Sequence, residues 1–232
     1  MTGTVVNTLA IFVGGLLGWW AGSLLPEKLK STLVSALGIV VAALGVEMVL
    51  GWGQYVVQVI LAVVLGGIIG EALDIEGRLQ NLGDKLQATL GKGLKGDLAS
   101  GFVYTTLIYC VGPMAVLGAL QSGLEGRHSI LFAKAAIDGL TAIAFASTLG
   151  PGVILSGISV LLYQGLIALG GQFVADAVTM ASAQLTATGG ILIIGIGIKI
   201  LDLKEIRVAN LLPALPVVVS LAWVVHWVSA LF

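Results

Sequence analysis

The stretch LFAKAAIDGLTAIAFASTLG, from Leu131 to Gly150, decides which kind of fold this chain has. Apart from Lys134 and Asp138 it consists of apolar, small or hydroxyl-bearing residues, and as a helix it is long enough to cross the roughly 30 Å hydrocarbon core of a bilayer. Charged side chains are rare in such helices, and where they occur they usually face a bundle interior or a water-filled cavity. The stretch therefore predicts a membrane helix packed inside a bundle.

The rest of the chain has the same apolar character. Of its 232 residues, 58% are hydrophobic and only 10% are charged, and the mean hydropathy is +1.08. A soluble domain of this length does not need so many apolar residues to fill one core, so the composition predicts an all-α integral membrane protein with the lipid bilayer as its main partner. The net charge of −1 gives no basic face for nucleic acid.

Eight segments are apolar over the length that a membrane span needs, which is about 20 residues. They are residues 3–24, 31–50, 54–72, 98–121, 129–148, 151–172, 186–201 and 207–230. Lys199 shortens the seventh segment, and Pro213 and Pro216 interrupt the eighth. The sequence therefore predicts one polytopic membrane domain, residues 1–232, with about eight transmembrane helices.

Residues 74–97, between the third and fourth spans, have a different pattern. Charges alternate there with apolar residues at helical spacing, which predicts an amphipathic helix along the membrane surface. The apolar positions are Ile75, Leu79, Leu82, Leu86 and Leu90.

Lysine and arginine positions predict the orientation, because positively charged loops stay in the cytoplasm. Only Arg127 falls in a loop on the opposite side from the others, so both termini are expected outside. The residues on the predicted cytoplasmic side are Lys28, Lys30, Arg78, Lys85, Lys92, Lys95, Lys199, Lys204 and Arg207.

A weak internal repeat offers one explanation of the topology. NTLAIFVGG, from Asn7, aligns with TTLIYCVGP, from Thr105, and the same offset relates later positions. Units 1–97 and 98–185 would then each contain three spans and enter the membrane from opposite sides, as in many transporters, with residues 186–232 as an added helix pair. The alternative is chance, since segments rich in Ala, Val, Ile, Leu and Gly match one another often.

Lys134 and Asp138 are the first candidate functional residues. Four positions apart, they share one helix face and can pair, and Asp138 falls near the middle of its span. One interpretation is a contact for a proton, ion or solute at Asp138, with Lys134 holding its charge state. The other is a self-neutralised pair that ties this helix to a neighbour.

Proline marks two further candidates. Gly112 and Pro113 predict a kink or break in the fourth span, which would expose backbone groups near the hydroxyls of Thr105 and Tyr109, although an ordinary healed kink is the commoner outcome. Asn210, just before Pro213 and Pro216, would lie at the cytoplasmic mouth of a pathway if this segment is functional, and is otherwise part of an irregular helix entry.

Nothing in the sequence predicts catalysis or a bound metal or other cofactor. Metalloprotease, serine-hydrolase, paired-aspartate and nucleotide-binding motifs are all missing from it. A stripe of Gly14, Gly18 and Gly22 predicts tight helix packing or the face of a homo-oligomer.

Several ordered blocks resemble the bacterial family of the domain of unknown function 554, the YdfK or YqgA type. The blocks are MTGTVVNTLAIFVGGLLG, LIYCVGPMAVLGALQSGL, AAIDGL, AFASTLG, LLYQG, GGILIIGIGI and IRVANLLPAL, and they run over the whole chain. The resemblance implies a multi-span protein of the bacterial inner membrane. It brings no substrate and no site residues.

The sequence as a whole favours a small secondary transporter or channel-like permease for an ion or small polar solute, without enzymatic activity. Its expected site lies where the broken fourth span meets Asp138 of the fifth. The alternative is a membrane scaffold or signalling subunit, whose polar residues only hold helices together.

Overall fold

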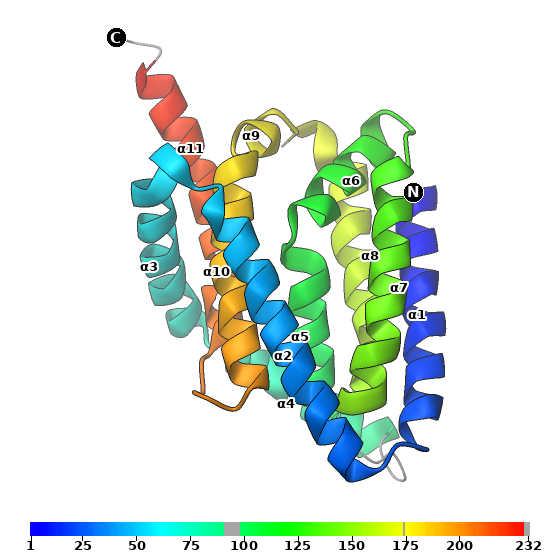
Figure 1. Cartoon of the computed structure of the whole chain (residues 1–232). Coiled ribbons are helices and arrows are strands. Elements are labelled where there is room, and N and C mark those ends of the chain that lie inside the picture. The colour runs from blue at the N-terminus through cyan, green and yellow to red at the C-terminus, as the bar shows by residue number, and fades with distance from the viewer. Residues whose placement is uncertain (91–97, 174, 230–232) are drawn as a thin grey trace.

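The computed structural model describes residues 1–90, 98–173 and 175–229, and within these ranges it contains helices and turns but no β-strand (Figure 1). The α-helices are α1 (Thr2–Gly22), α2 (Glu27–Leu50), α3 (Val56–Leu73), α4 (Ile75–Leu90), α5 (Leu98–Val111), α6 (Pro113–Leu124), α7 (Ser129–Leu149), α8 (Gly152–Gly170), α9 (Ala175–Met180), α10 (Ser182–Ile200) and α11 (Ala214–Ser229). Short 3-10 helices η1 (Gly53–Tyr55), η2 (Gly171–Phe173) and η3 (Val208–Leu211) precede α3, α9 and α11. The all-α prediction is confirmed.

Seven helical segments in the described ranges are long and apolar enough to cross a membrane. They are Thr2–Gly22, Glu27–Leu50, Gly53–Leu73, Ser129–Leu149, Gly152–Gly170, Ser182–Ile200 and Val208–Val228. The helices α5 and α6 are long and apolar enough only together, with a bend of 61° between them, and they give an eighth span if the bent pair crosses the membrane as one. The prediction of about eight spans is confirmed, and the fourth of them is the broken one.

The helices form two groups on either side of α5 (Figure 1). On one side α1 packs against α7 and α8, and on the other α2 packs against α10 and α3 against α11. The first three helices therefore pack mainly on helices from later in the chain. The predicted segments 1–97, 98–185 and 186–232 interleave in space and do not form separate bodies.

Glycines on α1 let its backbone come into direct contact with the backbone of α7. A Cβ atom on Gly14, Gly18 or Gly22 would collide with a backbone carbonyl oxygen of α7. The carbonyls belong, in the same order, to Gly139, Ile143 and Ser147, so both partners advance by four residues and the two helices run parallel. The predicted small-residue stripe is thus a packing surface within the chain, as is common between helices in lipid.

Apart from Lys134, which is buried inside α7, the described lysines and arginines separate to the two ends of the bundle. The N-terminal end of α1, the C-terminal end of α11 and the α6–α7 loop that carries Arg127 lie at one end (Figure 1). The α1–α2 loop, α4 and the turn after α10 lie at the other, with the remaining described cations. Lys92 and Lys95 fall outside the described residues. That the lysine-rich end faces the cytoplasm stays a prediction.

The predicted surface helix is α4, which lies across the lysine-rich end of the bundle (Figure 1). Asp74, in the left-handed conformation with φ 46°, makes the sharp turn from α3 into α4. Ile75 and Leu79 pack against the main core, as the apolar spacing predicts. The side chains of Leu82, Leu86 and Leu90 lie outside the described part.

Candidate functional site

Lys134 and Asp138 form a buried ion pair near the middle of α7. The Lys134 Nζ donates a hydrogen bond to Asp138 Oδ1 at 3.0 Å and lies 2.9 Å from Oδ2. The two side chains are only 8% and 4% exposed. Because α7 is itself a candidate span, this is a charged pair inside a membrane helix. The single ammonium of Lys134 contacts both carboxylate oxygens of Asp138.

Two amide side chains extend the pair across three helices. Asn7 of α1 donates from Nδ2 to Asp138 Oδ2 at 3.1 Å and to Gln164 Oε1 of α8 at 3.5 Å. Both amides are fully buried. We call Asn7, Lys134, Asp138 and Gln164 the polar network.

Several polar atoms around this network have no hydrogen-bond partner within the described protein. They are Asn7 Oδ1, Gln164 Nε2, Thr4 Oγ1 and Thr8 Oγ1, all on side chains that are at most 4% exposed. Thr4 lies three residues before Asn7 and four before Thr8, so it is a neighbour of both on the surface of α1. An unsatisfied buried polar group typically lowers stability by about 1–3 kcal/mol, so each of these atoms would be stabilised by a further polar partner.

Tyr109 brings α5 to the same network. Its ring centroid lies 5.9 Å from Lys134 Nζ, within cation–π range. Its hydroxyl accepts a weak hydrogen bond from Thr141 Oγ1 at 3.5 Å. Thr105, one turn earlier on α5, instead donates to the carbonyl of Gly101 in its own helix at 2.7 Å. Of these two candidate residues on α5, Tyr109 therefore lies beside the pair through its ring, whereas the Thr105 hydroxyl is bonded within its own helix.

The break between α5 and α6 lies just beyond Tyr109. Gly112 is extended, with φ −70° and ψ 149°, and Pro113 begins α6. A residue before proline is sterically pushed to such an extended conformation, and proline suits the first turn of a helix. The predicted break is present, and the proline with its effect on the preceding residue explains it.

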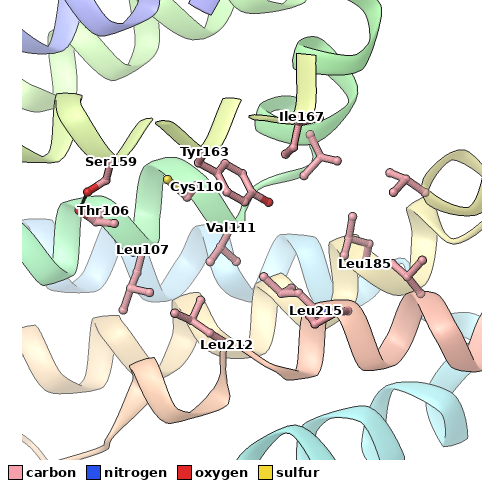
Figure 2. Close-up of a pocket in the computed structure, with 14 residues that line it drawn as sticks. Thr106, Leu107, Cys110, Val111, Ser159, Tyr163, Ile167, Leu185, Leu212 and Leu215 are labelled. Atoms are coloured by element: carbon pink, nitrogen blue, oxygen red, sulfur yellow. Dashed lines mark hydrogen bonds between the residues drawn. The ribbon is translucent and has the colours of Figure 1, made fainter. Parts of the chain in front are cut away.

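A cavity of about 510 Å³ lies beside the break, and α5 lines it with Thr106, Leu107, Cys110 and Val111 (Figure 2). Tyr109 is not among its lining residues. Its lining comes from α5, α6, α8, α9, α10 and α11 and is mostly aliphatic. The polar atoms on it are few, and the Thr106 hydroxyl is already bonded to Ser159 at 3.2 Å (Figure 2). The lining of this cavity therefore suits an apolar group. The charged pair is instead next to Tyr109, which does not line the cavity.

Asn210 belongs to a second polar cluster, at the lysine-rich end. Its Oδ1 accepts from the Glu76 backbone N–H at 2.7 Å, and its Nδ2 donates to Glu71 at 2.7 Å. Glu76 in turn pairs with Lys199 at 2.6 Å and accepts from the Ala209 N–H at 2.8 Å. We call these residues the Glu76 cluster. Asn210 fixes the α3–α4 turn to η3 and does not contact Asp138.

A polar cavity of about 220 Å³ opens beside the Glu76 cluster. Its lining includes Glu76, Gln80, Asp84, Ser100, Tyr104 and Lys199. Lys199 Nζ lies 5.6 Å from the ring centroid of Tyr104 on α5. Tyr104 is five residues from Tyr109, or about 7.5 Å along the helix, so α5 carries one aromatic ring beside each charged cluster.

Sequence reasoning gave no functional role to Glu76, Asn7 or Gln164. The sequence does show one isolated amide in each of two apolar spans, Asn7 and Gln164. Whether the two amides meet depends on the register between their helices, which the sequence does not give. Among the described residues, no group of three or more His, Cys, Asp or Glu is placed to hold a metal ion.

Comparison of the sequence with known proteins identifies one family and two bacterial relatives. A family model described as "Protein of unknown function (DUF554)" matches residues 2–223. The chain is 30% identical over 230 residues to "Uncharacterized membrane protein YdfK" of Bacillus subtilis (strain 168), which covers 97% of each sequence. It is 30% identical over 228 residues to "Uncharacterized protein YqgA" of Escherichia coli (strain K12), with 95% of this chain and 97% of the relative covered. No solved structure matches the chain.

Proposed function

The chain belongs to the DUF554 family, and from the geometry of its polar network we propose that it is a small secondary transporter or channel-like permease for an ion or small polar solute. The bacterial relatives make the inner membrane its expected location. The observation that carries the proposal is the buried Lys134–Asp138 pair with unpartnered polar atoms around it. Ionisable groups at this depth usually mark substrate or ion pathways.

A pathway to the pair is proposed along α5. It starts in the polar cavity beside Glu76 and Lys199, passes Tyr104 and reaches Tyr109 and Lys134. Both lysines lie against a tyrosine of the same helix, so α5 connects the lysine-rich end of the bundle with its centre. In this proposal the Glu76–Lys199 pair closes the entrance at the lysine-rich end.

In this proposal the moving element is α6, which is joined to α5 at the break at Gly112. Since α6 is joined to α5 through an extended residue, it can tilt without bending a continuous helix. Opening toward the other end of the bundle would follow from such a tilt. The inverted repeat belongs to the same proposal: in Figure 1 α1, α2 and α3 run opposite to α5 with α6, α7 and α8, respectively, although the two sets pack differently.

A scaffold without transport is the second candidate, and one observation favours it. The Lys134–Asp138 pair is already neutral, and through Asn7 and Gln164 it ties α1, α7 and α8 together. In a scaffold this network would stay dry. The transporter proposal requires water to reach it from one side of the membrane.

Cysteine accessibility separates the two candidates. In a Cys110→Ala background, Thr8→Cys places a thiol on α1 directly after Asn7, where the buried hydroxyl has no partner within the described protein, and Val160→Cys places one at a similarly buried, apolar position of α8. We expect a membrane-impermeant methanethiosulfonate to label Thr8→Cys in vesicles and to leave Val160→Cys unlabelled. If both thiols react only after denaturation, the network is dry and the scaffold is favoured.

A further inference from the structure

The Lys134 ammonium occupies a position that suits a small cation. It lies 3.0 Å from one Asp138 carboxylate oxygen and 2.9 Å from the other. The carboxylate is therefore a cation site whose present occupant is tethered to the same helix. A free cation can bind there only if Lys134 moves aside or loses its charge.

The unpartnered atoms show which cation would fit. Asn7 Oδ1 belongs to the amide that already bonds Asp138, and the buried hydroxyls of Thr4, one helical turn before Asn7, and of Thr8, the residue after it, also have no partner within the described protein. Carboxylate, amide and hydroxyl oxygens are the ligands of hard cations such as Na⁺, and neither thiol nor imidazole is part of this set. One carboxylate balances one positive charge, so the set matches a monovalent rather than a divalent ion.

Charge balance then decides what happens to Lys134. A cation bound to Asp138 beside a charged Lys134 would leave one uncompensated positive charge in a membrane core, which is strongly unfavourable. The other groups that face the pair cannot compensate it. Tyr109 of α5, Asn7 of α1 and Gln164 of α8 are uncharged side chains, and α6 has no charged residue.

The remaining helix packed against α7 is α2, and its charges are remote from the pair. They are Glu27, Lys28, Lys30 and Glu47, which lie near the ends of that helix. No described carboxylate other than Asp138 is thus available to neutralise a second cation.

We therefore propose, on the basis of the proposed transport function, that the site exchanges a monovalent cation for a proton of Lys134. The cation binds the Asp138 carboxylate, the Lys134 ammonium releases one proton to water and becomes a neutral amine, and the ionic contact between the two residues breaks. One positive charge enters and one leaves, so the site is neutral in both states. The Tyr109 ring on α5, whose centroid lies 5.9 Å from Lys134 Nζ, stays beside the freed amine.

Proton release on cation binding is the direct test. Purified protein in weakly buffered detergent solution is mixed with NaCl, and the released protons are measured with a pH dye; KCl and LiCl are run in parallel, and choline chloride is the control. We expect about one proton per bound cation. For a one-to-one exchange, the apparent Kd for the cation rises about tenfold for each unit by which the pH falls.

Variants separate the roles of the two charged residues. Asp138→Asn should abolish both cation-dependent thermal stabilisation and proton release. Lys134→Ala should still be stabilised by Na⁺ but release no proton. Since removing the lysine can impair folding, Thr8→Val is the second variant: it deletes one spare oxygen at nearly constant shape and should weaken cation binding, whereas Thr106→Val on the apolar cavity should not.

The possible failures are distinguishable. If Thr8→Cys is labelled from water but none of the three alkali cations releases protons, the exchange is wrong and the transport proposal stands. If a cation binds without proton release, the exchange is also wrong, because Lys134 keeps its proton. If there is neither labelling nor any cation effect, both proposals are wrong.

Discussion

At the scale of single residues, Asp138 is held by a cation of its own helix and by an amide of another. Lys134 neutralises the carboxylate, and the Asn7 amide donates hydrogen bonds both to Asp138 and to Gln164. Each member depends on the others, because a charged or polar group left without its partner in this environment is strongly destabilising. The network is therefore a unit in energetic terms.

Removing one charge should be worse than removing both. Lys134→Met leaves a buried carboxylate unpaired, and we expect a loss of about 3–5 kcal/mol in unfolding free energy. Lys134→Met combined with Asp138→Leu should recover most of that loss. Thermal unfolding in detergent measures both. Equal melting temperatures for the single and double variants would contradict the energetic coupling of the pair.

The sequence predicted the Lys134–Asp138 pair because both residues lie on one helix, where spacing alone gives the contact. It did not predict that Asn7 and Gln164 complete the network. Their contact depends on the register between α1, α7 and α8, which the close approach of the helix backbones sets. The position of Asn210 could not be predicted either. It lies beside Glu76 because the α3–α4 turn packs against η3, and the sequence does not show that contact.

At the scale of helices, backbone contact determines which surfaces pair. Gly18 sits against the carbonyl of Ile143 and leaves no space for a side chain. Gly170, the last residue of α8, faces open space. The two glycines thus provide a matched pair for testing the packing of α1 on α7.

Gly18→Ala should destabilise the protein and Gly170→Ala should not. The added methyl group forces α1 away from α7, and such overpacking typically lowers the unfolding free energy by about 1–3 kcal/mol. At Gly170 the same change is expected to be neutral or slightly stabilising. Melting temperatures of the two variants check this. A tolerated Gly18→Ala would mean that the two helices are not in backbone contact.

The helix break should depend on Pro113 more than on Gly112. The backbone of Gly112 has angles open to every residue, and a Cβ there would meet nothing within 4 Å, so Gly112→Ala should keep the bend. Pro113→Ala restores a backbone N–H and should let α5 and α6 straighten. Spin labels at positions 99 and 124 should then move apart by several ångströms. An unchanged distance would show that tertiary packing of α6 holds the bend.

At the scale of the whole molecule, the chain alternates between the two ends of the bundle and returns to the end where it began. The loop before α2 and the loop after α6 lie at opposite ends (Figure 1). The span count followed from apolar length alone. The interleaving of early and late helices did not, because apolar length carries no information about partners.

Cysteines at positions 27 and 125 should react from opposite sides of the membrane. Both glutamate side chains there are well exposed, 89% for Glu27 and 47% for Glu125, so access is not limiting. A membrane-impermeant thiol reagent applied to a Cys110→Ala background in oriented vesicles should label one position before lysis and the other only afterwards. Labelling of both from one side would rule out this topology.

The parallel contact between α1 and α7 also has a consequence for biogenesis. Gly14 meets Gly139, which the ribosome adds 125 positions later. At about 5–20 residues per second, α1 waits roughly 6 to 25 seconds in the membrane before its partner exists. During that time its glycine face and Asn7 have only lipid, the insertion machinery or other nascent helices as neighbours. The order of synthesis thus makes α7, with its charged pair, the segment whose insertion completes the assembly of α1.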